Sequence, residues 1–293
     1  MAATVIYLPP YSENEMKNIR ILSIQDISCV GQCSLTVALP ILSALGIETA
    51  ILPTALLSTH TGGFKGFTFL DLQEELPKIH AHWQKEGISF EGVYTGYLGS
   101  QKDVTIALEI AHGSTNKGPF FVDPAFGDHG SLYYGFDETY VKAMRSLAEH
   151  ADFLLPNLTE AYALLGLPYN PNPNEDEIKD LCFKLHDLGA KTIVLKGVGP
   201  KGQTGIVVSS NGRFEAYSHP RIPQDFHGTG DVFASVFVAA SLQGLCPLEA
   251  GKLACDFVCQ AIEATKDDPT HTYGVKFEPL LGELAMQLRE LAK

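Results

Sequence analysis

The chain has 293 residues, and its composition of 45% hydrophobic and 19% charged residues supports a large buried core and excludes a disordered chain. Its 21 Lys and Arg against 34 Asp and Glu give a net charge of −13 without a basic cluster, which excludes a nucleic-acid or anionic-membrane surface. An anionic ligand must therefore be held locally, by helix N-termini, backbone N–H groups, a few cations or a metal ion.

Residues 1–18 form a polar leader that we expect to be poorly ordered. The leader lacks an early positive charge, and Pro9-Pro10 ends its short apolar run, so we expect neither a signal peptide nor an anchor. No run in the sequence approaches the roughly 18 apolar residues of a membrane helix. The six cysteines are too sparse for a disulfide-stapled secreted scaffold. We therefore expect a cytoplasmic protein with a single domain at residues 19–293.

Strands and helices alternate through the first half of the chain. A β-branched strand is predicted at residues 19–24, followed by a turn at Gly31, a helix at 34–45 and a strand at 49–52. The next loop, residues 58–66, contains three glycines and is expected to be mobile. The alternation continues with helices at 71–85, 102–111 and 138–149 and with strands at 93–97, 120–122 and 153–155.

The second half of the chain keeps this alternation and adds a hairpin. Asn211-Gly212 supplies the positive φ angles of a tight turn, so the flanking runs form an antiparallel pair. The pattern predicts an α/β fold with a doubly wound, mostly parallel sheet, flanking helices and an antiparallel edge hairpin. Ligands of such sheets bind beyond the carboxyl ends of the strands. The remaining predictions are helices at 158–165, 175–188, 230–242, 248–264 and 277–291, and strands at 192–195, 205–209 and 213–217.

The segment His227-Gly228-Thr229-Gly230-Asp231 precedes a strongly apolar helix. Its two glycines let the backbone turn so that the N–H groups at the helix start converge into an anion site. Asp231 lies in the first turn, where a carboxylate suits a base that takes the proton of an attacking hydroxyl while the N–H groups stabilise the moving phosphoryl group. The alternative is that Asp231 only complements the helix dipole.

Residues 197–204 approach the pattern of a phosphate-binding P-loop. However, Gln203 stands where that motif requires Lys, and the segment precedes a predicted strand instead of opening a helix. This excludes a Walker site. Lys196, at the end of the preceding strand, remains a candidate cation for nucleotide phosphates, with an ordinary surface lysine as the alternative.

Two further candidate sites follow parallel strands. Asp123 follows one strand, and Asn157 and Glu160 follow the next. Carboxylates at this edge suit a Mg²⁺ ion that bridges ATP phosphates and keeps some of its waters. Alternatively, Asn157 and Glu160 cap the following helix in a capping-box pattern.

In this combination the chain resembles the ribokinase-like superfamily and, within it, the pyridoxal kinase family. The resemblance implies ATP-dependent phosphorylation of the 5′-hydroxyl of pyridoxal, pyridoxine or pyridoxamine in vitamin B6 salvage. It also implies Mg²⁺, a monovalent cation such as K⁺, and a homodimer. The resemblance rests on segments 23–25, 58–62, 95–100, 122–124, 156–160 and 228–231, which occur in the family's order.

The resemblance gives roles to the candidate residues. It makes Asp231 the catalytic base and the N–H groups of Gly228, Thr229 and Gly230 the anion hole. The remaining residues serve the two substrates. The Mg-ATP end is implied for Asp123, Asn157 and Glu160, the nucleotide phosphates for Lys196, and the vitamer pocket for His60, Thr61 and Tyr97 under a closing loop that excludes water.

One departure from the family concerns Asp26. Family members commonly carry Ser at this position, where it contacts the pyridine ring. A carboxylate there would pair with a protonated ring nitrogen or a substrate amine, so we expect a vitamer preference shifted toward pyridoxamine.

Two rival functions remain. A hydroxymethylpyrimidine kinase or another small-molecule kinase of the superfamily is one, although residues 25–31 are poorer in glycine than the segment that hydroxymethylpyrimidine kinases usually carry there. A non-catalytic vitamer-binding protein is the other, because a fold alone does not fix a function. An intact Asp231 beside an intact anion site argues against it.

Overall fold

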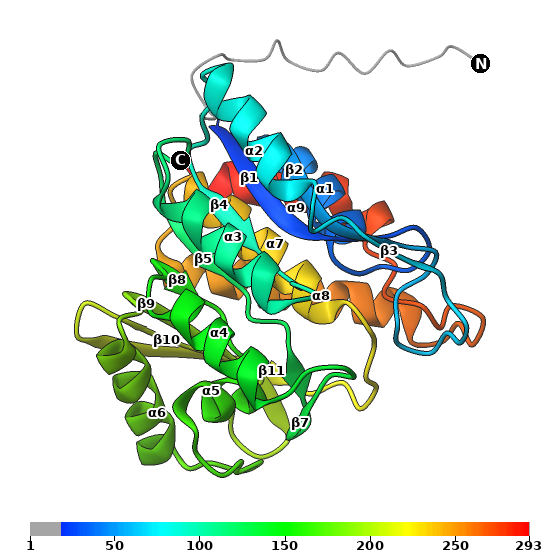
Figure 1. Ribbon diagram of the computed structural model, residues 1–293. Coiled ribbons are helices and arrows are strands. Elements are labelled where there is room, and N and C mark those ends of the chain that lie inside the picture. Colours follow the sequence, from blue (N-terminus) through cyan, green and yellow to red (C-terminus); the bar gives the residue numbers. More distant parts are fainter. Residues whose placement is uncertain (1–18, 293) are drawn as a thin grey trace, which may run out of the picture.

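The computed structural model, which describes residues 19–292, has a nine-stranded sheet at its centre (Figure 1). The predicted leader at residues 1–18 lies outside the described residues. The strand order across the sheet is β11-β10-β9-β8-β5-β4-β1-β2-β3. These strands are β1 (Ile19–Ser28), β2 (Ile47–Leu57), β3 (Phe69–Asp71), β4 (Val93–Thr95), β5 (Phe120–Val122), β8 (Phe153–Leu154), β9 (Thr192–Lys196), β10 (Gln203–Ser210) and β11 (Arg213–Pro220).

The centre of the sheet is parallel, as predicted. β1 pairs in parallel with β2 and β4, and the parallel pairing continues through β5, β8 and β9. β10 and β11 form the predicted antiparallel hairpin at one edge. In its turn Asn211 has a φ of 50° and Gly212 a φ of 74°, as a tight hairpin requires. The doubly wound architecture with an antiparallel edge hairpin is confirmed.

At the opposite edge of the sheet, one predicted helix boundary is wrong. The helix predicted at 71–85 begins only at Leu76, as α2 (Leu76–Lys85), with a proline in its first turn. The residues before it form β3, which pairs antiparallel with β2, so that Leu70 lies opposite Leu56. A strand of three residues is too short to show an alternating pattern in the sequence. The last predicted helix likewise divides into a 3₁₀ turn, η1 (Glu278–Leu280), and α9 (Leu281–Leu291).

Helices cover both faces of the sheet and create two hydrophobic cores (Figure 1). Successive strand residues point to opposite faces, so Ile21 belongs to the first core and Leu22 to the second. Burying both faces leaves the strand ends as the place where loops meet a ligand. The first core is formed with α1 (Leu35–Ala44), α7 (Thr229–Leu242), α8 (Pro247–Thr265) and α9, and the second with α2, α3 (Gln101–His112), α4 (Glu138–Ala148), α5 (Leu158–Leu165) and α6 (Glu175–Leu188).

Candidate active site

The start of α7 is shaped by a glycine. Gly228 precedes the first helical turn and has a left-handed backbone with a φ of 77°. A side chain at this position would meet the carbonyl oxygen of Gln32 at 1.7 Å, so only glycine fits. The N–H groups of a first helical turn have no acceptor within the helix, and Asp231 lies in this turn. The predicted anion site and the predicted base therefore occupy one helix start.

Asp231 is held by the loop that precedes α1. The backbone N–H of Ser34 donates to Oδ2 of Asp231 at 3.0 Å. Asp231 is half-buried as a residue, and burial of its carboxyl group raises its pKa to about 7. The Ser34 N–H and Lys196 lower this pKa, whereas Asp123 and Asp26 raise it further. A carboxyl group that titrates near neutrality is suited to accept the proton of a hydroxyl.

Lys196 ends β9 and reaches the same site from a neighbouring strand. Its Nζ lies 2.8 Å from Oδ1 of Asp123, with side chains that are 13% and 3% exposed. A Cβ at Gly230 would lie 4.0 Å from the same Nζ, which places the ammonium beside the start of α7. Burial by itself lowers the pKa of Lys196, but Asp123 and Glu160 outweigh it and the pKa is raised. The alternative of an ordinary surface lysine is therefore wrong.

Asn157 and Glu160 form the capping box at the start of α5. Oδ1 of Asn157 accepts from the backbone N–H of Glu160 at 3.0 Å, and Oε2 of Glu160 accepts from that of Asn157 at 2.9 Å. Oε1 of Glu160 accepts from the N–H of Phe126 at 3.1 Å. Burial raises the pKa of Glu160 to about 8, Lys196 lowers it and Asp123 raises it. The helix-capping alternative is thus confirmed, and it brings the Glu160 carboxyl group into the acidic centre.

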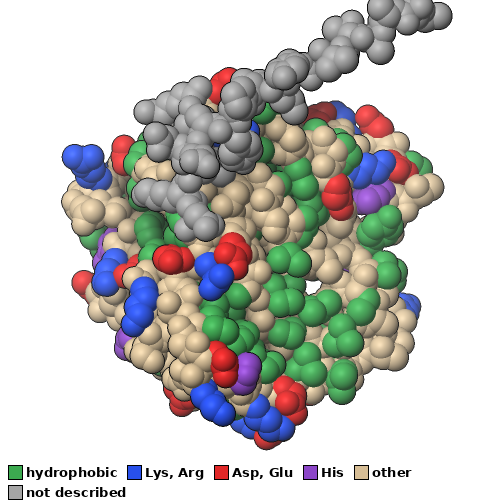
Figure 2. All heavy atoms as spheres, turned by 90° about the horizontal axis from the view of Figure 1, so that it is seen from above, with side chains coloured by type: hydrophobic (Ala, Val, Ile, Leu, Met, Phe, Trp, Pro, Cys, Tyr) green, Lys and Arg blue, Asp and Glu red, His purple; other side chains and the backbone are tan. Residues whose placement is uncertain are grey.

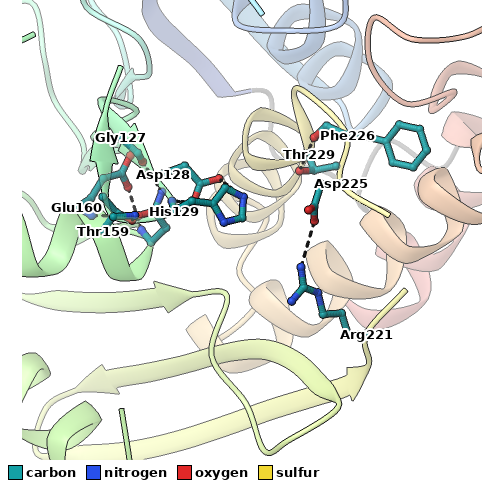
Figure 3. A network of polar contacts seen from close by, with 11 residues as sticks. Gly127, Asp128, His129, Thr159, Glu160, Arg221, Asp225, Phe226 and Thr229 are labelled. Carbon is teal, nitrogen blue, oxygen red and sulfur yellow. Dashed lines mark hydrogen bonds and ion pairs between the residues drawn. The ribbon is translucent and has the colours of Figure 1, made fainter. Parts of the chain in front are cut away.

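A short hairpin lies beside the start of α5, with Gly127 and Asp128 near Thr159 and Glu160 (Figure 3). The hairpin joins β6 (Gly127–Asp128) to β7 (Ser131–Leu132). The Asn157 amide donates to the carbonyl of Gly127 at 2.8 Å, and the hydroxyl of Thr159 accepts from the N–H of Gly130 at 2.8 Å. Two hydrogen bonds therefore fix the hairpin to the first turn of α5.

A second group of contacts orders the loop that leads into α7 (Figure 3). Arg221 and Asp225 form an ion pair at 3.2 Å within this loop. The hydroxyl of Thr229 donates to the carbonyl of Phe226 at 3.3 Å. Both contacts lie within the segment that leads into the start of α7.

Tyr133 is a site residue that the sequence analysis does not single out. It follows β7 and is 43% exposed as a residue. Burial nevertheless raises the pKa of its hydroxyl, and the phenol also lies within electrostatic reach of the carboxylates of Glu160, Asp128, Asp231 and Asp123. The phenol therefore lies within electrostatic reach of the acidic centre. An aromatic residue just after a glycine-containing turn is the only signal that the sequence offers.

Asp26 lies near the end of β1 and is 4% exposed. Its Oδ2 accepts from the hydroxyl of Ser28 at 3.0 Å. Burial raises the pKa of Asp26, and hydrogen bonds from Ser34 and Ser28 oppose this shift. The pKa of Tyr97 is raised to about 12 by burial and then by Asp26. Asp26 therefore lies within electrostatic reach of both Tyr97 and Asp231.

His60 is a buried residue of the loop 58–66, packed against two other loops. Its Nδ1 accepts from the N–H of Gly62 at 3.1 Å, and its ring lies 5.2 Å from the ring of His227. A Cβ at Gly31 would meet the His60 ring at 2.0 Å, so the loop after β1 must carry glycine there. Thr61 is exposed beside His60. The mobility of this loop stays a prediction.

Charged side chains of both signs are interspersed on the face drawn in Figure 2. Within residues 19–292, no helix is long and apolar enough to cross a membrane. A groove of about 710 Å³ lies between β11, α8 and α9 and is not lined by any of the site residues described above. The candidate site is marked instead by its converging buried charges, whose shifted pKa values are typical of functional sites.

Known proteins resemble this chain in sequence and in fold. The family model described as phosphomethylpyrimidine kinase matches residues 39–275. The pyridoxal kinase of Arabidopsis thaliana is 28% identical over 262 residues, which cover 85% of this chain and 83% of the relative.

Two solved structures share the fold closely. The pyridoxal kinase of Lactobacillus plantarum is 33% identical with a TM-score of 0.86, and the match covers 93% of this chain and 98% of that one. A Bacteroides thetaiotaomicron protein that is described as a phosphomethylpyrimidine kinase and was solved with pyridoxal is 35% identical with a TM-score of 0.85, and the match covers 92% of this chain and 96% of that one. The predicted ribokinase-like fold is thereby confirmed.

Proposed function

We propose that this chain, which belongs to the phosphomethylpyrimidine kinase family and within it resembles the pyridoxal kinases, transfers the γ-phosphoryl group of ATP to the 5′-hydroxyl of a B6 vitamer. The vitamer is pyridoxal, pyridoxine or pyridoxamine. The observation that carries this proposal is the carboxylate of Asp231 in the first turn of α7, with the backbone of Gly228 fixed beside it. The solved relative that contains pyridoxal supports the choice of substrate.

Asp231 acts as the general base. Its carboxylate accepts the proton of the vitamer hydroxyl as the oxygen attacks the γ-phosphorus, and the bond from that phosphorus to the β,γ-bridging oxygen breaks. The products are the 5′-phosphate and ADP. The N–H groups of Gly228, Thr229 and Gly230 and the ammonium of Lys196 stabilise the negative charge on the phosphoryl oxygens. Because these groups are already in place, they need little rearrangement during the reaction.

The Mg-ATP end of the site is assigned to the carboxyl edge of β5, β8 and β9. Oδ1 of Asp123 accepts from Lys196, and both oxygens of Glu160 accept backbone N–H groups. No group of three His, Cys, Asp or Glu suited to hold a metal occurs among residues 19–292. This set fits a Mg²⁺ ion held mainly by phosphates and water, because Mg²⁺ takes few protein ligands. Asp123 and Glu160 would hold it, partly through water, with Asn157 beside them at the ATP end, and the ion would neutralise phosphate charge.

The vitamer end is assigned to Asp26, His60, Thr61 and Tyr97. Asp26 and Tyr97 lie on neighbouring strands, β1 and β4, or directly after them. His60 and Thr61 come from the loop 58–66, whose closure would exclude water as a competing phosphoryl acceptor. A buried carboxylate at Asp26 favours a cationic vitamer, which is the basis for the expected preference for pyridoxamine.

Three further parts of the proposal rest on the family resemblance. They are a monovalent cation such as K⁺, a homodimer, and a cytoplasmic location within vitamin B6 salvage. Each is open to direct measurement, by activity in K⁺ against Na⁺ buffers, by light scattering and by cell fractionation.

A second candidate substrate is hydroxymethylpyrimidine, which the family name favours. One assay distinguishes the two, because ATP consumption can be measured with each of the three vitamers and with hydroxymethylpyrimidine at equal concentration. We expect at least one vitamer to give the highest kcat/KM. A higher value for the pyrimidine would reassign the substrate. Binding of vitamers without any ATP consumption would make the chain a vitamer-binding protein.

A further inference from the structure

Ser34 occupies an unusual position between two acidic residues of the site. It is 4% exposed and immediately precedes α1. Its backbone has a φ of 54° and a ψ of −131°, a combination that residues with a Cβ rarely adopt. Such strain persists where the surrounding structure holds it, and it concentrates at functional sites.

The two polar groups of Ser34 reach different carboxylates. Its backbone N–H donates to Oδ2 of Asp231 at 3.0 Å. Its side chain lies close enough to Asp26 to lower the pKa of that carboxyl group, as does Ser28, whose hydroxyl donates to Oδ2 of Asp26 at 3.0 Å. The hydroxyl gives α1 no capping hydrogen bond, so helix formation does not explain the serine.

We propose that Ser34 is a positioning residue. Its strained backbone orients the carboxylate of Asp231, and its hydroxyl orients that of Asp26. The distance between the base Asp231 and Asp26, which is assigned to the vitamer end, is thereby kept constant. This inference rests on the proposed function for the roles of the two carboxylates. It adds a residue that touches neither ATP nor vitamer in our assignment. Positioning of this kind matters because a base must be held to within about 0.5 Å of its productive geometry.

The alternative is that Ser34 serves only the fold, and glycine separates the two explanations. Glycine adopts the observed φ without strain, so Ser34→Gly should leave the melting temperature unchanged or raise it. If Ser34 aims Asp231, the same change loosens the N–H donor and slows turnover. Loss of kcat without loss of stability is a result that a purely structural role does not produce.

Ser34→Ala isolates the hydroxyl, because alanine keeps both the N–H and the left-handed strain. A hydrogen bond to a charged group is commonly worth about one order of magnitude in a binding equilibrium. We therefore expect Ser34→Ala to raise KM for the preferred vitamer about tenfold with kcat changed less than about threefold. Ser34→Gly should show the same KM and, in addition, a kcat that is about tenfold lower.

Thr36→Val provides the matched control. The hydroxyl of Thr36 lies two residues further on and donates to the carbonyls of Gly31 and Cys33 at 2.9 and 2.7 Å. It contributes to the same loop without a hydrogen bond to Asp26 or Asp231. We expect Thr36→Val to lower the melting temperature and to leave kcat and KM nearly unchanged.

The experiment measures kcat, KM and melting temperature for the wild type and these three variants, with crystal structures of the two Ser34 variants. The inference is supported if the kcat and KM effects divide as described and the Asp231 carboxylate moves in Ser34→Gly. It is overturned if both Ser34 variants keep wild-type kcat and KM, or if Thr36→Val changes them equally. A wild type that phosphorylates no vitamer would refute the proposed function instead. The crystal structures would still test Ser34, since an unmoved Asp231 carboxylate in Ser34→Gly contradicts the inference without any turnover.

Discussion

Lys196 and Asp123 form a buried ion pair, with Nζ of the lysine 2.8 Å from Oδ1 of the aspartate. Lys196 is the last residue of β9, and Asp123 directly follows β5. The strand β8 lies between β9 and β5 in the sheet. Asn157, which follows β8 and caps α5, forms an isolated parallel bridge with Lys196. Three neighbouring parallel strands thus deliver a cation, a carboxylate and a helix cap to one edge.

Removing the lysine should cost both stability and turnover. Lys196→Met leaves Asp123 buried without its partner, and breaking a buried pair in this way typically costs about 3–5 kcal/mol of unfolding free energy. Turnover should also fall, because the cation beside Gly230 is lost. Chemical denaturation and steady-state kinetics measure the two effects.

Lys191→Met is the matched control. Lys191 pairs with Asp152 at a similar 2.7 Å, but its side chain is 74% exposed. Exposed pairs contribute roughly 0–1 kcal/mol, so this variant should keep nearly all its stability and activity. Equal losses in the two variants would contradict the assignment of Lys196 to the site.

The pH dependence of turnover should report Asp231. Its pKa is raised to about 7, and only the ionised carboxylate accepts a proton, so kcat/KM should rise with pH and level off above about 7. A plateau that extends down to pH 5 would show that another group serves as the base.

The raised pKa of Asp231 also affects stability, which should fall with rising pH where turnover rises. A carboxyl group with a raised pKa in the folded state binds its proton more tightly there than in the unfolded chain. Its stabilising contribution is therefore complete below the ordinary value near 3.8 and is lost as the pH rises through about 7. Asp231→Asn should raise the melting temperature more at pH 8 than at pH 5.

Asp26 should set the order of preference among the vitamers. Asp26→Ser removes the buried negative charge, so the ratio of kcat/KM for pyridoxamine to that for pyridoxal should fall by about tenfold, a typical value for one charge-assisted hydrogen bond. Steady-state kinetics with both vitamers measure the ratio. If the ratio does not change, Asp26 does not contact the part of the vitamer that distinguishes them.

Gly228 should tolerate no side chain. In Gly228→Ala the new Cβ would meet the carbonyl oxygen of Gln32 at 1.7 Å, so the start of α7 must shift. Loss of an aligned N–H donor typically lowers kcat about a hundredfold or more. Gly212→Ala is the control, because Gly212 has a similar φ of 74° with nothing within 4 Å of the added Cβ. It should lose about 1 kcal/mol of stability and keep its kcat.

Periodicity and turn chemistry predict most of the fold. Three elements have the predicted bounds, namely α5 at 158–165, α6 at 175–188 and β5 at 120–122. Long periodic patterns and strongly apolar runs predict such elements well. β3 is not predictable in the same way, since three exposed residues become a strand only by pairing with β2. Tertiary pairing decides such short elements.

The candidate site is predictable only in part. Asp231 follows from its motif, because a glycine-flanked helix start with an acidic residue is a local pattern. The pairing of Lys196 with Asp123 joins residues 73 positions apart and depends on the order of the strands, which the sequence pattern leaves open. Tyr133 follows a two-residue strand, where no periodic signal exists to mark it.

Transfer of the labelled phosphoryl group from [γ-³²P]ATP to a B6 vitamer, in a single turnover, tests the central claim most directly. We expect the wild type to yield labelled 5′-phosphate from at least one vitamer. Asp231→Asn should yield almost none while still binding the vitamer in calorimetry. If the wild type labels none of the vitamers, the proposed function is contradicted. If Asp231→Asn labels a vitamer as fully as the wild type does, Asp231 is not the base.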